Sequence, residues 1–336
     1  MKTKNLNKLK NKFNKFNVDG YIVPKNDNFF SEYVYLDRLK IISNFSGSAG
    51  MAIILKNKNF LFVDGRYTVQ AKMQSGKLYK IVEIHKHLPK KILKNITLGF
   101  DPKLFTNDQL KFLFGDKIKL RAINENLVDK IAVLKKPKIN QFYSLNKKIV
   151  GQSYKSKIKI VSTILKRKKA DFLFISAPEN VAWILNIRGS DVPFSPIPNC
   201  NLILDKHKNI YLFTDKAKVK NLIREGKIKK NRILNLNKLG EFIQTLPGKN
   251  IIVDRKTCSI YIENILSSKF KIINSEDPCY LLKSLKNSTE IENIKKSHVV
   301  DGAALTKFLI WIKNTDRKIS EIYAEKKLET FRKKNK

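Results

Sequence analysis

Short motifs recur in the same order in the two halves of this chain, most of them about 150 positions apart. The matched segments are Gly20–Val23 and Asp171–Ile175, Asn44–Ser48 and Asn186–Ser190, Leu61–Asp64 and Tyr211–Asp215, Leu98–Asp101 and Ile252–Asp254, and Leu134–Pro137 and Leu285–Ser288. Five matches in one order are difficult to obtain by chance. The repeat therefore constrains the chain to two copies of one folding unit.

Each copy combines strands with helices. The apolar runs Met51–Leu55 and Phe60–Val63 flank a four-residue polar turn, a pattern that predicts a β-hairpin. Helical segments such as Thr106–Phe114 and Ser153–Lys169 alternate with further apolar runs. Hairpins together with strand–helix alternation predict mixed sheets with helices packed on them. The expected fold class is therefore α/β, with two tandem units.

Composition suggests where the units begin and end. The segment Pro137–Tyr154 contains Pro, Asn, Ser and Gly and is typical of a link, which predicts a first unit at 1–148 and a second at 149–285. From Asn287 onward, a polar cap and acidic residues precede two predicted helices with broad apolar faces. Such faces need a partner surface, so 286–336 is expected to begin a further, incomplete domain.

Two segments are candidates for a functional site. The segment Asp64–Tyr67 places an Asp and an Arg directly after the hairpin; it is either a binding site or a capped strand end whose charges pair on the surface. The segment 186–198 has three prolines in its last six residues, which stiffen the backbone. It either lines a cleft with Arg188 and Asp191 or braces a domain junction. The residues themselves leave these alternatives open.

The net charge of +39 at pH 7 is a property that nucleic-acid binders share. Only ten of the 68 basic residues are Arg, which is the usual reader of bases and phosphates. The Lys residues are also spread along the whole chain instead of forming one stripe. We interpret the charge as a chain-wide compositional bias and expect no nucleic-acid partner.

Neither a membrane span nor a secretory signal is predicted. No run approaches the roughly 18 apolar residues of a spanning helix. The basic start of the chain leads into an amphipathic helical pattern at Leu6–Phe16 instead of a long apolar core. The four histidines lack the company of other metal ligands, and no pair of cysteines has metal-site spacing. We expect a cytoplasmic protein with no membrane partner, and we interpret the cysteines as buried thiols: Cys200, Cys258 and Cys279.

Seven groups of residues have the order and spacing of one known family. They are Tyr21–Pro24, Ser31–Tyr33, Ser46–Gly50, Asp64–Tyr67 with Gln70–Ala71, Trp183–Pro193, Ile291–His298 and Asp301–Ala304. Through these motifs the whole chain resembles the N-terminal part of aminopeptidase P, the Xaa-Pro aminopeptidase of the pita-bread metallopeptidase family. The resemblance implies two tandem creatinase-like N-terminal domains followed by the first helices of a pita-bread domain.

The resemblance also implies an activity. The family removes the N-terminal residue from peptides with proline at the second position, and it uses two divalent metal ions, usually manganese. Its metal ligands and catalytic histidines lie in the pita-bread body, beyond the motifs found here. We therefore expect no catalytic residue and no metal ligand in this chain; His298 and Asp301 match an entry-helix motif that does not bind metal. The chain is expected to be a C-terminally truncated, inactive portion of a homodimeric enzyme that dimerises through the missing domain.

One substrate contact carries over from the family motif. The resemblance assigns substrate binding to Arg66, with Asp64 and Tyr67 as supporting residues. Two other function classes stay open. A non-catalytic protein-interaction module derived from an aminopeptidase P is the first, since such regions occur in a histone-chaperone subunit without catalysis. A nucleic-acid binder is the second.

Overall fold

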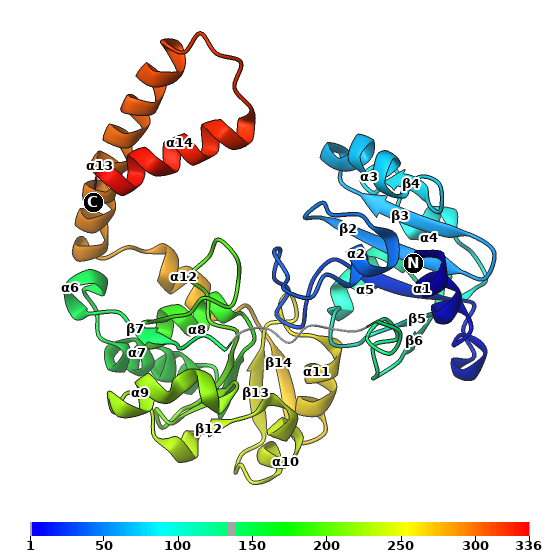
Figure 1. Cartoon of the computed structure of the whole chain (residues 1–336). Helices are drawn as coiled ribbons and strands as arrows, with labels where there is room; N and C mark the ends of the chain where they lie inside the picture. Colours follow the sequence, from blue (N-terminus) through cyan, green and yellow to red (C-terminus); the bar gives the residue numbers. More distant parts are fainter. Residues whose placement is uncertain (1, 133–138, 336) are drawn as a thin grey trace.

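The computed structural model describes residues 2–132 and 139–335, and in these residues two six-stranded sheets share one design (Figure 1). The strands of the first sheet are β1 (Gly20–Pro24), β2 (Gly50–Leu55), β3 (Asn59–Val63), β4 (Lys80–Glu83), β5 (Thr97–Phe100) and β6 (Lys119–Ala122). The strands of the second sheet are β8 (Phe172–Ile175), β10 (Asn201–Asp205), β11 (Ile210–Phe213), β12 (Ile233–Leu234), β13 (Asn250–Val253) and β14 (Lys271–Asn274). The order β4-β3-β2-β1-β5-β6 is repeated as β12-β11-β10-β8-β13-β14. The predicted α/β fold of two tandem units is confirmed.

Both sheets are mixed, as predicted. In the first, β1 pairs antiparallel with β2 and parallel with β5, and β3 pairs parallel with β4. In the second, β8 pairs antiparallel with β10 and parallel with β13. The inner strands β1 and β10 are buried along their whole length because helices cover both faces, whereas the edge strand β6 is largely exposed.

Helices flank each sheet. Those of the first half are α1 (Lys2–Lys10), α2 (Arg38–Ser43), α3 (Thr68–Ser75), α4 (Pro89–Ile92) and α5 (Asn107–Phe114). Those of the second half are α6 (Lys147–Val150), α7 (Tyr154–Arg167), α8 (Pro178–Leu185), α9 (Lys220–Arg224), α10 (Leu239–Gln244), α11 (Ile260–Ser267) and α12 (Pro278–Ser284). Thr106 and Gln109 form a capping box at the start of α5, and Ser153 caps α7. These caps explain why both helices begin where the sequence predicts.

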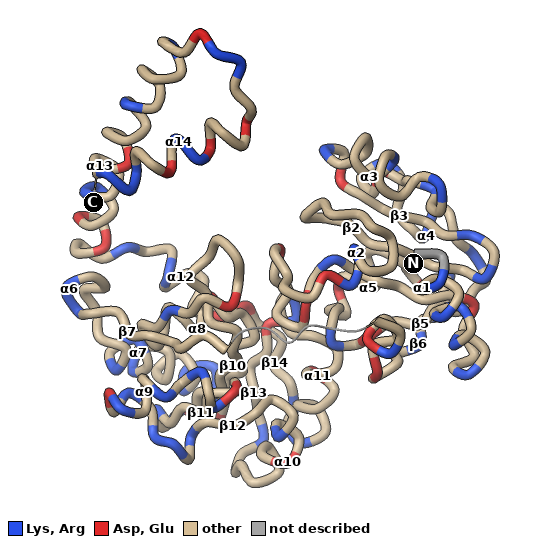
Figure 2. The backbone as a smooth tube through the Cα atoms, viewed as in Figure 1, with Lys and Arg blue, Asp and Glu red and all other residues tan. Residues whose placement is uncertain are grey.

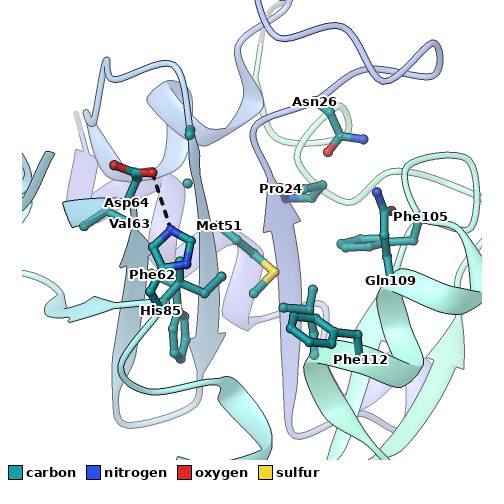
Figure 3. Close-up of a pocket in the computed structure, with 14 residues that line it drawn as sticks. Pro24, Asn26, Met51, Phe62, Val63, Asp64, His85, Phe105, Gln109 and Phe112 are labelled. Carbon is teal, nitrogen blue, oxygen red and sulfur yellow. Dashed lines mark ion pairs between the residues drawn. The ribbon is translucent and has the colours of Figure 1, made fainter. Parts of the chain in front are cut away.

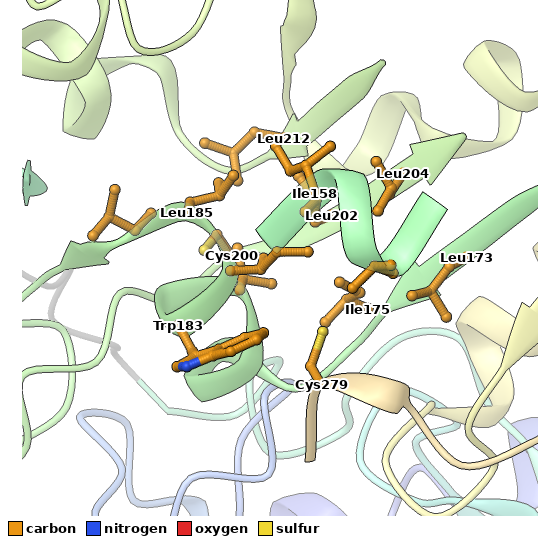
Figure 4. Packing of buried hydrophobic residues seen from close by; sticks show 14 of the residues in the cluster. Ile158, Leu173, Ile175, Trp183, Leu185, Cys200, Leu202, Leu204, Leu212 and Cys279 are labelled. Carbon is orange, nitrogen blue, oxygen red and sulfur yellow. The ribbon is translucent and has the colours of Figure 1, made fainter. Parts of the chain in front are cut away.

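Apolar side chains fill the space between each sheet and its helices. One face of the first sheet packs on α1 and α2 through buried residues such as Leu9 and Leu39, and the other packs on α5 through Phe114. Figure 4 shows the corresponding packing in the second half, where Ile158 and Trp183 lie against strand residues. Each half therefore has a core of its own.

A helical pair follows the second sheet and extends away from it (Figure 1). It consists of α13 (Ser288–Lys313), which starts at the Asn287–Glu290 capping box, and α14 (Glu321–Lys334). Arg332 of α14 forms an ion pair with Asp301 of α13, 2.7 Å apart. Val299 and Ile322 are 74% and 65% exposed, so the predicted apolar faces lie open in this structure.

The predicted link between the halves is only partly described. Its first two residues lie outside the described residues, as does the predicted repeat segment Leu134–Pro137. Tyr143–Ser144 forms β7, which pairs antiparallel with β9 (Ile187–Arg188), and the Phe142 N–H donates to the Lys218 carbonyl at 2.7 Å. The limits 1–148, 149–285 and 286–336 stay predictions, and we propose that the second unit already begins near Phe142.

Candidate functional site

Asp64 ends the first hairpin and starts a single 3-10 turn, Gly65–Tyr67. Its carboxylate accepts the backbone N–H of Arg66 at 3.0 Å, the usual way in which an Asp caps a helical turn. This contact satisfies a backbone donor and requires nothing of the Arg66 side chain. A capped strand end, one of the two alternatives from the sequence, is therefore present.

The side chain of Arg66 adds a second contact to the same carboxylate. Its Nε donates to Asp64 Oδ1 at 2.9 Å, and its guanidinium lies 5.4 Å from the centre of the Tyr67 ring. The side chain remains 68% exposed. Within the part of the chain that the structure describes, no acceptor is hydrogen-bonded to either terminal nitrogen of Arg66. Two parallel donors are thus held at the surface, the geometry that grips a carboxylate or carbonyl.

Tyr67 ties the turn to the Gly/Ser-rich segment before β2. Its hydroxyl lies 2.9 Å from that of Ser48, which donates to Glu32 at 3.0 Å. Because the one Ser48 proton is used on Glu32, the Tyr67 hydroxyl is the donor to Ser48. The ring also packs edge-on against Phe45 at 5.8 Å. Tyr67 is therefore fixed by its hydroxyl and by its ring, and the ring lies against the Arg66 guanidinium.

His85, which no sequence motif singled out, joins this group. Its Nε2 lies 3.5 Å from Asp64 Oδ2, so each carboxylate oxygen faces a different partner. The parallel pairing of Val63 with Glu83 brings the ends of β3 and β4 to the same edge. Recognising Lys80–Glu83 as the parallel neighbour of β3 would have predicted this position. We call Asp64, Arg66, Tyr67 and His85 the strand-end cluster.

Electrostatics keep Asp64 and Arg66 charged. The Arg66 side chain and then its backbone N–H lower the pKa of Asp64 to about 2, with a smaller contribution from His85. The same pair raises the pKa of Arg66 above its ordinary value. The Asp64 carboxylate is therefore ionised throughout the physiological range and orients the guanidinium.

A pocket of about 380 Å³ adjoins the cluster (Figure 3). It lies between the β2–β3 hairpin and α5, and Asp64 and His85 belong to its wall. The remaining lining is mostly apolar and includes Met51, Phe62 and Phe112. Asp64, which binds the exposed guanidinium, thus also belongs to the pocket wall.

The proline-rich segment 186–198 braces the second half. Arg188 Nη1 donates to the Ile187 carbonyl at 2.8 Å, and Asp191 accepts from Lys218 Nζ and from the Asn199 N–H, both at 2.8 Å. The Asp191 side chain is only 4% exposed. The structure does not bring Arg188 or Asp191 to the strand-end cluster.

The described residues contain no group of three His, Cys, Asp or Glu side chains that could hold a metal ion. Cys200, Cys258 and Cys279 are all buried, and burial raises the pKa of each thiol. His298 and Asp301 lie on α13, where Asp301 pairs with Arg332. The described residues therefore do not fit a metal pair. In the same residues, no helix has both the length and the apolar composition needed to cross a bilayer.

Figure 2 shows Lys and Arg distributed over both halves and along the helical pair. This arrangement agrees with the compositional bias inferred from the sequence. Within it, Arg66 differs from the surrounding lysines because an ionised carboxylate and an aromatic ring fix its position.

Comparison with known proteins places both halves in one family. The creatinase/prolidase N-terminal domain is matched twice, at residues 5–128 and 133–290. The chain is 29% identical to Xaa-Pro aminopeptidase 1 of Dictyostelium discoideum, over 98% of this chain and 57% of that protein. It is 30% identical to a probable Xaa-Pro aminopeptidase P of Laccaria bicolor, over 98% of this chain and 55% of that protein.

A solved structure agrees with these relatives. The X-prolyl aminopeptidase of Caenorhabditis elegans, described as a cytosolic enzyme with a di-nuclear active site, matches with a TM-score of 0.84 and 25% identity. The match covers 99% of this chain and 60% of that one. The chain thus spans somewhat more than half the length of the relatives it matches. It belongs to the creatinase/prolidase N-terminal domain family, of which it carries two consecutive copies in the arrangement found in Xaa-Pro aminopeptidases.

Proposed function

We propose that this chain is the substrate-positioning portion of an Xaa-Pro aminopeptidase, a metal-dependent enzyme that releases the residue before a proline. Similarity to proteins of that name along 98% of this chain supports the reaction class. The single structural observation that carries the proposal is the exposed guanidinium of Arg66, held in place by Asp64 and Tyr67 with its terminal nitrogens directed to no described partner.

In this proposal Arg66 binds a carbonyl or carboxylate of the peptide through two parallel hydrogen bonds. Asp64 fixes the guanidinium plane, and the Tyr67 ring limits its movement. Holding the peptide in one orientation lowers the entropy that must be lost before reaction, so these residues act by positioning. None of them is assigned to bond cleavage.

The chemistry itself is proposed to require a metal-binding domain, on the same or another polypeptide. Two divalent metal ions, which we propose to be Mn²⁺, would supply a hydroxide nucleophile and polarise the scissile carbonyl. We propose a homodimeric, cytoplasmic enzyme whose subunits contact each other mainly through that domain; the C. elegans neighbour is described as cytosolic. By itself, the 336-residue chain is proposed to be inactive.

If the chain were instead a non-catalytic interaction module, its surface should expose few large apolar side chains. The apolar side chains exposed on α13 and α14, Val299 and Ile322 among them, favour the aminopeptidase interpretation because they need a covering domain.

Two measurements test the proposal. Purified chain incubated with Mn²⁺ and Ala-Pro-Ser is expected to release no alanine, and metal-dependent release would contradict the proposed inactivity. Binding of the same peptide, followed by NMR shift changes, is expected to weaken about tenfold in Arg66→Gln, because charge-assisted hydrogen bonds are lost. Arg224→Gln, an arginine change on an exposed helix end of the second half, is the matched control and should bind normally. Equal binding by both variants would remove Arg66 from the site.

A further inference from the structure

The pocket beside the strand-end cluster has the features of a side-chain subsite. We call it the β3–α5 pocket; its lining comprises Pro24, Asn26, Ala49–Met51, Phe62–Asp64, Ile84, His85, Phe105, Gln109, Phe112 and Leu113. Its volume of about 380 Å³ falls at the lower end of the roughly 300–1,000 Å³ typical of small-ligand pockets. Figure 3 shows Met51 at the centre of the floor, with the α5 side chains opposite Asp64 and His85.

Hydrogen bonds and ion pairs within the protein already use one atom or more of each polar side chain in the lining. Asn26 donates to the Leu104 carbonyl at 2.9 Å, and the Gln109 side chain accepts from the Thr106 N–H in the α5 capping box. Asp64 is paired with Arg66 and faces His85. A ligand therefore meets a mostly apolar surface with four polar side chains, Asn26, Asp64, His85 and Gln109, which favours an apolar side chain over a charged one.

The floor and far wall provide that apolar surface. Met51 and Phe62 are buried in the first-half core and cannot move out of the way easily. Phe112, on α5, is 62% exposed at the rim. Covering this exposed aromatic ring with another apolar group would remove apolar surface from water and so favour binding in the β3–α5 pocket.

The placement of Arg66 identifies the occupant as part of a peptide. One oxygen of Asp64 binds the guanidinium, and the other faces His85 on the pocket wall. A peptide whose carbonyl or carboxylate binds the terminal nitrogens of Arg66 is therefore held by a residue that shares Asp64 with the pocket wall. This step rests on the proposed function.

We propose that the β3–α5 pocket is a subsite for an apolar side chain of the peptide substrate, on a residue beyond the proline. The pocket and Arg66 then act together: the guanidinium holds the peptide backbone or terminus, and the pocket selects the adjacent side chain. The enzyme accordingly prefers peptides with Leu, Met or Phe after the proline over those with Ser, Asp or Glu.

The test compares two tripeptides that differ only at the third residue, Ala-Pro-Leu and Ala-Pro-Ser, by NMR titration of the full 336-residue chain. The wild-type chain is expected to bind the leucine peptide about tenfold more tightly, since a buried apolar side chain gains that much. Phe112→Ser should reduce this ratio to about threefold or less while leaving the affinity for Ala-Pro-Ser unchanged.

Met73→Ser is the matched control. Met73 is 84% exposed on α3 and does not line the pocket, so the variant changes another exposed apolar side chain elsewhere in the same half. It should keep the tenfold ratio. Circular dichroism of both variants checks that the fold is retained. A ratio that falls equally in the two variants would overturn the subsite.

The outcomes separate this inference from the proposed function. If wild-type chain binds both peptides equally and Arg66→Gln weakens both, the subsite is wrong and the proposed function stands. If the leucine preference depends on Phe112 but Arg66→Gln has no effect, the subsite stands and the role of Arg66 is wrong. If neither peptide binds at millimolar concentration, both are overturned.

Discussion

The two halves of the chain use the same backbone at the end of the hairpin but put different side chains on it. Asp64 accepts the N–H of Arg66 at 3.0 Å, and Asp215 accepts the N–H of Ala217 at 2.8 Å, each starting a 3-10 turn. The aspartate is thus explained by capping in both halves. The arginine is present at this position in the first half, and Ala217 takes its place in the second half. Each aspartate caps a turn in its half, and the exposed guanidinium of Arg66 is the feature that distinguishes the first half at this position.

The residue after that position also differs. Tyr67 supports an exposed guanidinium, whereas its counterpart Lys218 is consumed in an ion pair with Asp191, with side chains only 15% and 4% exposed. In the first half the strand end carries a cation available to a ligand. In the second half the cation lies one position further along, at Lys218, and stabilises the proline-rich loop. The same turn therefore presents an exposed cation in the first half and contributes a buried ion pair in the second half.

The largest expected effect concerns this buried ion pair. Asp191→Ala leaves the Lys218 ammonium without its carboxylate in a nearly closed site, so the second half should lose about 3 kcal/mol of stability. Asp215→Ala, the control, removes only a cap and should lose about 1 kcal/mol. Urea unfolding followed by Trp183 fluorescence, in a Trp311→Phe background, measures both. Equal losses would show that the bracing is not what distinguishes the second half.

A second effect comes from Lys157, a buried lysine of the second half. Its Nζ donates to Asn186 Oδ1 at 2.7 Å and to the Trp183 carbonyl at 3.1 Å. Burial lowers its pKa from 10.5 to about 8, partly offset by the charge of Glu290. Between these pH values the unfolded chain therefore holds more protons than the folded chain.

The stability of wild-type chain relative to Lys157→Met should accordingly rise by roughly 3 kcal/mol from pH 8 to 10.5, with no change in the difference below pH 8. Comparing the two proteins at each pH cancels the titration of the other lysines and tyrosines. A difference that stays flat across this window would mean that the folded ammonium is not penalised by burial.

A third prediction separates capping from orientation. Asp64→Ala and Asp215→Ala remove equivalent caps and should cause similar, small losses of stability. Only Asp64→Ala should also weaken the binding of Ala-Pro-Ser, by about fivefold, because the guanidinium loses its orienting partner while its charge remains. If both variants bind the peptide equally well, the difference between the halves does not concern this ligand.

The smallest effect concerns pH. Because Arg66 lowers the pKa of Asp64 to about 2 from 3.8, the carboxylate contribution to the folded state is fully present above about pH 4 and is lost as pH falls through 2. Carboxyl ¹³C titration of wild-type chain should show no Asp64 transition between pH 8 and 4. In Arg66→Gln the transition should move toward 3.8. A wild-type transition near 4 would break the proposed pairing.

Much of this arrangement could be predicted from local sequence. The recurrence of an aspartate after an apolar run, at Asp64 and Asp215, indicated the repeat and the hairpin ends in both sheets. The proximity of Asp64 and Arg66 followed from their separation by two positions. The helical segments starting at Thr106 and Ser153 followed from their pattern, and the structure shows that both residues cap their helices. Such features depend on residues within a few positions of one another.

Other features required the tertiary structure. His85 faces Asp64 because β4 pairs in parallel with β3, and the pocket exists because α5 packs opposite Met51. The burial of Asp191 against Lys218 inside the second half was likewise not apparent from the sequence, and the choice between a cleft wall and a domain junction stays a prediction. Strand register and helix packing bring together residues that are far apart in sequence, so the stability of these contacts cannot be inferred from any single segment. The sequence by itself thus determined the repeated α/β units and the adjacency of Asp64 and Arg66, whereas only the folded chain decided which charges stay free at the surface.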